Sequence, residues 1–378
     1  MARFRILVPI ALALALGLLP SASGQTAPPR DTLGPQTAGA SGLYITGPFV
    51  RRYGAEGVIR IVTSSHMDAA VIDVKDATGR VHHDSAIPEL QAQETGMLGD
   101  TAQFVRDLHA GGIYAIARIV CFSDPVLAVQ DVDRAIQHSR RRRPTAWVSW
   151  GTGGAWLDPW DTRNHDMIIA LAREAEALGF DEIQLDYIRF PVDEGIQYAR
   201  YPHERDGVRR RDMLLEFLGR VDEAVAIPLG VDVFGIQAYW AGDSSGLGQD
   251  LELWTRHVDV FTPMLYINAM RGWEVGRPDR TRRLVQIGVT RLRERLGPGP
   301  IIRPFLQAFP QGAGGTYGPG FIRDEIVGAE RGGADGVLFW HPGSNYGMLQ
   351  RAMHGPARSL LPFEIPASRT EARALVGG

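Results

Sequence analysis

The sequence has few of the residues on which several classes of protein depend. Cys121 is the only cysteine, so no intrachain disulfide can form. Lys75 is the only lysine. The sequence has 40 Lys and Arg residues in total, and all the others are Arg. The formal net charge is -3 at pH 7, so the basic footprint of a nucleic-acid-binding protein is missing. These properties exclude a disulfide-rich scaffold and argue against nucleic acid or an anionic membrane as a partner.

Three familiar motifs are also missing. GxGxxG and GxxxxGK[ST], which bind dinucleotides and nucleoside phosphates, do not occur, and neither does the HExxH of zinc hydrolases. We interpret His82 and His83 as a surface pair, and no HxH occurs at the first predicted strand. We therefore expect no cofactor and no metal site.

The N-terminus has the pattern of a secretory signal peptide. Arg3 and Arg5 precede an apolar run over residues 6–19, and small residues follow up to Gly24. We expect residues 1–24 to be a signal peptide and residues 25–40, rich in Pro, Gly, Thr and Ala, to be a linker. The mature protein is then periplasmic or secreted, and without a cysteine after the apolar run it has no lipid anchor.

Short apolar segments typical of strands alternate with helical patterns through the rest of the chain. The expected strands are residues 42–47, 69–76, 114–122, 182–188, 228–235, 258–266, 301–309 and 336–340. The expected helices are residues 54–65, 101–110, 125–141, 165–178, 214–225, 251–256, 280–296, 320–332 and 348–353. This alternation predicts a single (β/α)8 TIM barrel over residues 41–361, with a peripheral tail at 362–378. An open doubly wound sheet is the alternative.

The fourth predicted strand belongs to the stretch GFDEIQLDYIRFP, residues 179–191. Its period-two alternation places Gln184 and Asp186 on the inward side. A carboxylate there is costly to bury unless it is paired or used in chemistry. Pairing with Arg189 or with backbone N–H groups is the structural explanation, and catalysis is the functional one.

Polar and aromatic residues gather at the carboxyl ends of the predicted strands, where barrel enzymes place their active sites. We expect them to form an acid-bearing cup with aromatic edges, joined by Trp156 from a tryptophan-rich loop. The members of this cup are Asp73, Lys75, Arg118, Asp186, Arg189, Asp232, Tyr266, Gln307, Trp340 and His341.

Asp186 and Asp232 are the predicted catalytic pair. Neighbouring strands lie about 4.8 Å apart, so the two carboxylates fall within the roughly 5–10 Å separation that glycoside hydrolysis uses. One would act as nucleophile or base, and the other would protonate the leaving oxygen. Structural alternatives stay open: Asp232 could pair with Arg189, and Lys75 with Asp73 or Asp76. The tryptophans could serve loop packing, and His341 could be an edge histidine.

Several segments resemble one known family. GFDEIQLDYIRFP, preceded by AVIDVKD and followed by GVDVFG, PMLY, RPFLQAF and FWHPGSNY, is similar to a glycosyl-hydrolase-like TIM-barrel family of bacterial secreted proteins. The likeness runs from about Gly42 to Tyr346 and includes Trp156–Pro159, similar to the family's Trp-x-Asp-Pro segment. It implies a distant relation to the α-amylase clan, with Asp186 as nucleophile and Asp232 as acid. Ile267–Met270 after PMLY and Ala308 after Gln307 depart from the family pattern, so the clan's third carboxylate has no counterpart.

The sequence thus favours a glycoside hydrolase acting on a polysaccharide or oligosaccharide, such as an envelope glycan. The adjacent-strand placement of the two carboxylates favours a retaining mechanism. A catalytically inactive glycan-binding barrel is the alternative from another class. A metal-dependent hydrolase is a third, less supported hypothesis.

Overall fold

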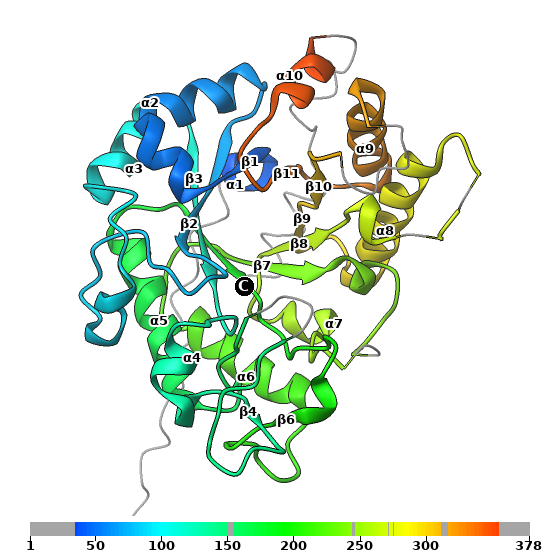
Figure 1. Cartoon of the computed structure of the whole chain (residues 1–378). Helices are drawn as coiled ribbons and strands as arrows, with labels where there is room; N and C mark the ends of the chain where they lie inside the picture. The colour runs from blue at the N-terminus through cyan, green and yellow to red at the C-terminus, as the bar shows by residue number, and fades with distance from the viewer. Residues whose placement is uncertain are drawn as a thin grey trace, which may run out of the picture.

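The computed structural model describes residues 35–149, 154–243, 246–270, 272–274, 276–310 and 317–354. The expected signal peptide, most of the linker and the C-terminal tail lie outside these residues. In the described part, a parallel sheet closes on itself, and helices surround it (Figure 1). This confirms the predicted TIM barrel and excludes the open doubly wound sheet.

The barrel strands follow one another around the ring in chain order. β11 pairs with β1 through Gly42 and Leu338, which closes the barrel. The seventh strand is interrupted at Arg303 and Pro304, and its two halves pair with the sixth and eighth strands. The barrel strands are β1 Gly42–Ile45, β2 Ala69–Lys75, β3 Tyr114–Val120, β5 Glu182–Asp186, β7 Leu229–Phe234, β8 Val260–Met264, β9 Ile301–Ile302, β10 Phe305–Gln307 and β11 Leu338–Trp340.

The strands are buried on both faces, as expected of a parallel barrel covered by helices. Every residue of β2, β3 and β5 is buried. On β2, Ala69 and Val71 pack inside the barrel, whereas Ala70 and Ile72 pack against the helices. This alternation decides which polar residues at the strand ends face the barrel mouth.

Most helices follow the apolar periodicity of the sequence. α2 begins at Gly47 rather than near residue 54, and Gly54, with φ +60°, kinks it. α5 begins at Thr162 because the side chain of Asp161 accepts a hydrogen bond from Arg163 N. The longer helices are α2 Gly47–Ser64, α3 Thr101–Ala110, α5 Thr162–Ala177, α6 Arg210–Asp222, α8 Arg280–Leu296 and α9 Pro319–Gly332. The short ones are α1 Pro35–Gly39, α4 Leu127–Gln130, α7 Leu251–Trp254 and α10 Gly347–Met353.

The helix predicted over residues 125–141 is wrong. Only α4 and a 3-10 turn over Val132–Arg134 form there. α4 is begun by Asp124, whose side chain accepts hydrogen bonds from Val126 N and Leu127 N. The chain leaves helical geometry at Asp131 and continues into β4 Gln137–His138, which pairs with β6 Ala199–Arg200. Ile136 N donates to Trp156 O, so the backbone here pairs with a distant segment and not within a helix. The apolar residues of this segment therefore pack in a loop region.

The amino-terminal end of the barrel is filled by a buried ion pair. Arg303 Nη1 lies 3.1 Å from Glu182 Oε2, and Arg303 Nη2 donates to Thr37 O at 2.6 Å. Thr37 belongs to α1, in a range expected to be linker, and it is buried. Within the described residues, no helix is both long enough and apolar enough to cross a membrane.

Candidate active site

Three carboxylates surround one guanidinium at the carboxyl ends of neighbouring strands. Arg118 of β3 places Nη1 2.5 Å from Asp73 Oδ1 of β2 and Nη2 2.5 Å from Asp186 Oδ2 of β5. Its Nε lies 3.6 Å from Asp232 Oδ2 of β7. We call Asp73, Arg118, Asp186 and Asp232 the acid cluster. All four side chains are buried or nearly so.

Strand register explains why these four residues meet. Asp73 lies beside Arg118 in the pairing of β2 with β3, and Arg118 lies beside Gln184 in the pairing of β3 with β5. On β7, Val231 and Val233 pack outward in the core, so Asp232 faces inward. The alternation of short strands therefore directs all four side chains to the barrel mouth.

Asp186 is held by strong donors. Arg118 Nε and Nη2 both donate to its Oδ2, at 3.1 Å and 2.5 Å, and Tyr187 N donates to its Oδ1 at 2.6 Å. Tyr187 has φ +53°, a strained conformation for a bulky residue that is common at functional sites. These donors stabilise the charged carboxylate of Asp186.

Asp232 has a different environment. Its Oδ1 accepts a hydrogen bond from Gln184 Nε2 at 2.8 Å, whereas its Oδ2 accepts none from the described residues. Burial raises the pKa of Asp232 well above its usual range, and the charge of Asp186 raises it further. Burial and the neighbouring carboxyl group thus favour the protonated form of Asp232.

The two carboxyl groups are close enough to act on one bond. Arg118 Nε lies 3.1 Å from Asp186 Oδ2 and 3.6 Å from Asp232 Oδ2, so these oxygens are less than about 7 Å apart. Retaining glycosidases place their carboxyl groups about 5–5.5 Å apart, and inverting enzymes about 6.5–9.5 Å apart. The bound is compatible with the shorter separation and with the lower end of the longer one.

Tyr44 is a member of the site that the sequence reasoning missed. Its hydroxyl donates to Asp73 Oδ2 at 2.5 Å, and its ring lies 5.4 Å from Arg118 Cζ. Burial raises the pKa of Asp73, and the bonds from Arg118 and Tyr44 oppose that shift. The signal was available in the period-two pattern of β1, which turns Gly42 and Tyr44 to the same side.

Aromatic rings form one edge of the mouth. Trp340 is only partly buried, and its ring lies 6.1 Å from that of Tyr44 and 5.8 Å from that of Tyr266. Phe309 packs edge-on against Trp340 at 5.2 Å. Burial, followed by the charges of Asp232 and Asp186, raises the pKa of Tyr266 well above its usual range. The charges of the carboxyl pair thus act on Tyr266.

Lys75 and Gln307 are buried among protein groups. Lys75 Nζ lies 3.0 Å from Asp124 Oδ2 and donates to Val120 O, so its partner is neither Asp73 nor Asp76. Gln307 Oε1 accepts from Asn268 N, and its Nε2 donates to Phe309 O. Both residues are fully buried and stabilise the strand ends rather than the open mouth.

Trp156 and Arg189 lie together on the β5 and β7 side of the mouth. Trp156 is fully buried, and the Arg189 guanidinium lies over its ring at 4.7 Å. Trp147 and Trp160 are buried too, and Trp150 lies outside the described residues. The described loop tryptophans thus serve packing and offer no open face to a sugar. Arg189 forms no ion pair with Asp186 or Asp232, contrary to the structural alternative.

His341 follows β11 at the edge of the site and is only partly buried. Gly343 N and Asn345 N both donate to its Nδ1, at 3.0 Å and 3.2 Å. Its Nδ1 is therefore an acceptor, and the hydrogen of the neutral ring is on Nε2. Burial lowers the pKa of His341. His341 can offer one N–H donor at neutral pH.

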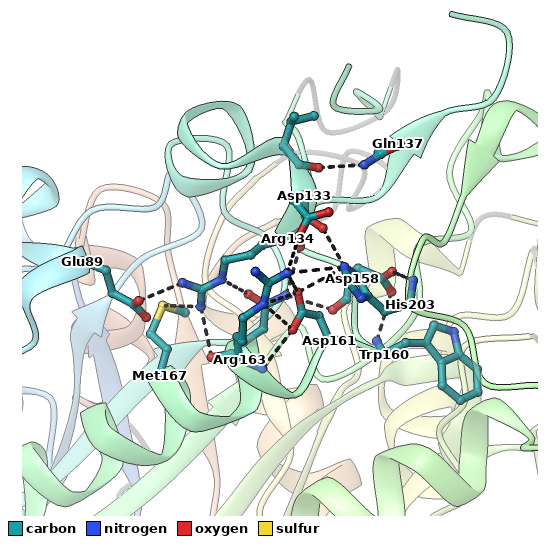
Figure 2. Close-up of polar contacts among 12 residues, drawn as sticks. Glu89, Asp133, Arg134, Gln137, Asp158, Trp160, Asp161, Arg163, Met167 and His203 are labelled. Carbon is teal, nitrogen blue, oxygen red and sulfur yellow. Dashed lines mark hydrogen bonds and ion pairs between the residues drawn. The ribbon is translucent and has the colours of Figure 1, made fainter. Parts of the chain in front are cut away.

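A polar network around Asp158 and Arg134 holds the segment that leads into α5 (Figure 2). Asp158 accepts hydrogen bonds from Trp160 N and His203 N, both at 3.0 Å. Arg134 donates to Glu89 Oε2 at 2.8 Å and to Arg163 O at 3.0 Å, tying this segment to α5. Burial raises the pKa of Asp158 to about 6. The expected surface position of His82 and His83 is wrong, because both are buried, where they lie beside Asp76 and Glu174. Among the residues that the structure describes, no group of three His, Cys, Asp or Glu side chains is arranged to hold a metal ion.

The fold is similar to those of several solved glycosidases. The glycoside hydrolase domain of PgaB (BpsB) from Bordetella bronchiseptica is 13% identical, with a TM-score of 0.60 over 85% of this chain and 97% of that one. An α-L-fucosidase from Paenibacillus thiaminolyticus is 15% identical, with a TM-score of 0.53 over 85% of this chain and 50% of that one. A dextranase from Flavobacterium johnsoniae is 10% identical, with a TM-score of 0.51 over 86% of this chain and 39% of that one.

At these identities the likeness shows a shared fold and no more. The search of curated proteins finds no match. One family model matches residues 42–346, which contain every barrel strand and the whole acid cluster. By that match the chain belongs to the family described as "Putative glycosyl hydrolase domain".

Proposed function

We propose that this protein is a glycoside hydrolase that cleaves a polysaccharide or oligosaccharide with Asp186 as nucleophile and Asp232 as proton donor. The contrast between the two carboxyl groups supports this assignment. Asp186 receives three hydrogen bonds from cationic and backbone donors, whereas Asp232 is buried with one oxygen unbonded and a raised pKa. Environments that separate two carboxyl groups in this way divide the roles of acid and nucleophile.

In the first step, the bond between the anomeric carbon and the leaving oxygen breaks. The leaving oxygen takes the proton of Asp232, and a carboxylate oxygen of Asp186 bonds to the anomeric carbon. Asp232 then removes a proton from water, the water oxygen bonds to the anomeric carbon, and Asp186 departs. Arg118 stays bonded to Asp186 Oδ2 at the start and end of the cycle, which stabilises its departure as a carboxylate.

Access to the site bears on the alternative function. Asp186 is 5% exposed and Asp232 is 1% exposed. A sugar can reach Asp232 only if the side chains that cover it move. If they do not, the same mouth would bind a glycan without cleaving it, which is the inactive glycan-binding barrel.

We also infer that the protein acts outside the cytoplasm. The support is the N-terminal pattern of Arg3, Arg5 and the apolar run over residues 6–19. N-terminal sequencing of the protein from periplasmic and culture fractions tests this inference. A new N-terminus near Gly24 is the expected result, and an uncleaved chain in the cytoplasm contradicts it.

The test of the function is a screen of the purified mature protein against bacterial and plant polysaccharides, with new reducing ends as the readout. The expected result is cleavage of at least one polysaccharide, with loss of cleavage but not of binding in Asp186→Asn. Binding without product in the unmutated protein would favour the glycan-binding barrel. Activity that a chelator removes and an added metal restores would favour a metal-dependent hydrolase.

A further inference from the structure

Arg189 is a buried cation without a carboxylate partner. Its side chain is 5% exposed. In the described part of the chain, the other buried arginines are Arg118, Arg134 and Arg303, and each lies within ion-pair distance of a carboxylate. Arg189 has no such contact there. A charged group out of water without a counter-charge costs several kcal/mol, so its retention calls for an explanation.

Three aromatic rings hold the guanidinium in place. Its Cζ lies 4.6 Å from the Phe234 ring centre, 4.7 Å from that of Trp156 and 5.3 Å from that of Tyr187. Cation–π contacts of this kind compensate only part of the lost hydration. Burial lowers the pKa of Arg189. The charges of Asp193, Tyr187 and Asp186 act in the opposite direction, and burial has the larger effect.

The free edge of the guanidinium is the edge that binds anions. Arg189 Nη1 donates to Phe190 O at 3.2 Å, whereas Nε and Nη2 donate to no described residue. Neither of these two nitrogens is among the fully enclosed polar atoms that lack a partner, so both reach solvent. Nε and Nη2 together form the fork that receives two oxygens of a carboxylate side by side.

This fork lies at the same strand ends as the catalytic pair. Phe234 follows Asp232 by two residues on β7, and Tyr187 follows Asp186 directly after β5. Two residues along a strand span about 7 Å, roughly the length of one sugar ring. A group bound to Arg189 would therefore belong to a sugar at or next to the bond that is cleaved.

We propose that the substrate of this site is an acidic glycan, and that Arg189 binds an anionic substituent of the sugar at or beside the scissile bond. The carboxylate of a uronic acid fits the fork, and a sulfate or phosphate ester shares the required charge and paired oxygens. A neutral sugar would satisfy the N–H donors of Arg189 and leave its charge uncompensated. This inference rests on the proposed glycosidase site and narrows its substrate class.

The first experiment compares ligands and needs no change at Arg189. Calorimetric titration of the Asp186→Asn protein, which prevents turnover, measures dissociation constants for glucuronate- and galacturonate-containing oligosaccharides and for their carboxyl-reduced forms. The expected result is binding of an acidic form about 10- to 100-fold tighter than its reduced form, since a charge-assisted hydrogen bond contributes roughly 1.5–3 kcal/mol. Glucose 6-sulfate and glucose 6-phosphate show which anions the fork accepts.

The second experiment changes Arg189 and a matched control. Arg189→Met keeps the volume and removes the charge, and Arg189→Lys keeps the charge and removes the fork. Arg210 also lies over two rings, Phe190 and Tyr201, and donates to a carbonyl, but it is at the start of α6. We expect Arg189→Met to remove the preference for the acidic form, Arg189→Lys to reduce it, and Arg210→Met to leave it unchanged.

The outcomes separate this inference from the proposed function. Equal affinity for acidic and carboxyl-reduced forms, or no binding of any anionic ligand, overturns the inference. If Arg189→Met does not fold, the comparison of ligands decides alone. If the protein cleaves neutral glycans and Arg189 has no role, the inference of an acidic substrate is wrong and the proposed hydrolase function is still supported. Binding of acidic glycans through Arg189, without cleavage by the unmutated protein, supports the inference and contradicts the hydrolase.

Discussion

Arg118 donates two hydrogen bonds to a single carboxylate oxygen of Asp186, from Nη2 at 2.5 Å and from Nε at 3.1 Å. Its remaining terminal nitrogen, Nη1, binds Asp73, and Nε also lies 3.6 Å from Asp232. One planar group therefore fixes the positions of the three carboxyl groups around it. Lysine has no equivalent fork, so it cannot replace this arrangement.

We expect Arg118→Lys to lower kcat/KM by about 100-fold, comparable to losing one preorganised donor. Steady-state kinetics on a cleaved glycan measures this loss. Arg303→Lys is the matched control, since Arg303 pairs with Glu182 at the other end of the barrel. It should reduce stability and leave kcat/KM of the folded protein unchanged. An unchanged kcat/KM in Arg118→Lys would contradict the role given to Arg118.

Asp232→Asn should lower the rate by about 10²–10⁴-fold on substrates whose leaving group needs a proton. Burial, followed by the charge of Asp186, raises the pKa of the Asp232 carboxyl, and the proton donor is lost as the pH rises past that raised pKa. The alkaline limb of the wild-type profile should therefore disappear in the variant. Aryl glycosides, whose leaving groups need no proton, should be cleaved by Asp232→Asn and not by Asp186→Asn. The reverse pattern would exchange the two roles.

Glu325→Gln should flatten the dependence of stability on pH. Burial raises the pKa of Glu325 well above its usual range, with its Oε1 accepting from Gln307 N. The folded protein holds this proton more tightly than the unfolded chain, whose glutamate pKa is about 4.3. The contribution of Glu325 to stability is therefore greatest below that pH, and it is lost as the pH rises towards the pKa of Glu325 in the folded protein. Urea unfolding from pH 4 to 8 should show a smaller decline in Glu325→Gln than in the wild type.

Lys75→Met should destabilise the fold by about 3–5 kcal/mol, because it leaves Asp124 buried without its counter-charge. The double variant Lys75→Met with Asp124→Asn should recover much of this loss, since asparagine keeps the oxygen that accepts from Val126 N and Leu127 N. Denaturant unfolding of the single and double variants measures both effects. A double variant no more stable than Lys75→Met would show that the ion pair is not the cause.

The sequence predicted the barrel because its strands are short, apolar and regularly spaced, as β5 and β7 illustrate. It placed Asp186 and Asp232 on the inward sides for the same reason. It could not predict the partner of Lys75. Strict alternation puts Lys75 on the side of Asp73, but the pairing of β2 with β3 shifts register between these residues. Such a shift depends on the neighbouring strand and leaves no mark in the local pattern.

The surroundings of Arg189 were equally out of reach. Phe234 and Trp156 come to it from β7 and from the loop before α5, so the contact depends on how distant segments pack. The failed helix over residues 125–141 has a related cause. Its apolar residues contact the Trp156 segment, and a periodicity of 3.6 cannot distinguish that packing from a helix face.

The complete burial of Lys75 has a practical consequence. Because the chain contains no other lysine, amine-reactive dyes and cross-linkers should modify the folded protein only at its N-terminal amino group. Such a reagent attaches one probe per molecule without mutagenesis. A second modified site in the mass spectrum would then report the fraction of molecules in which the β2 end of the barrel has opened.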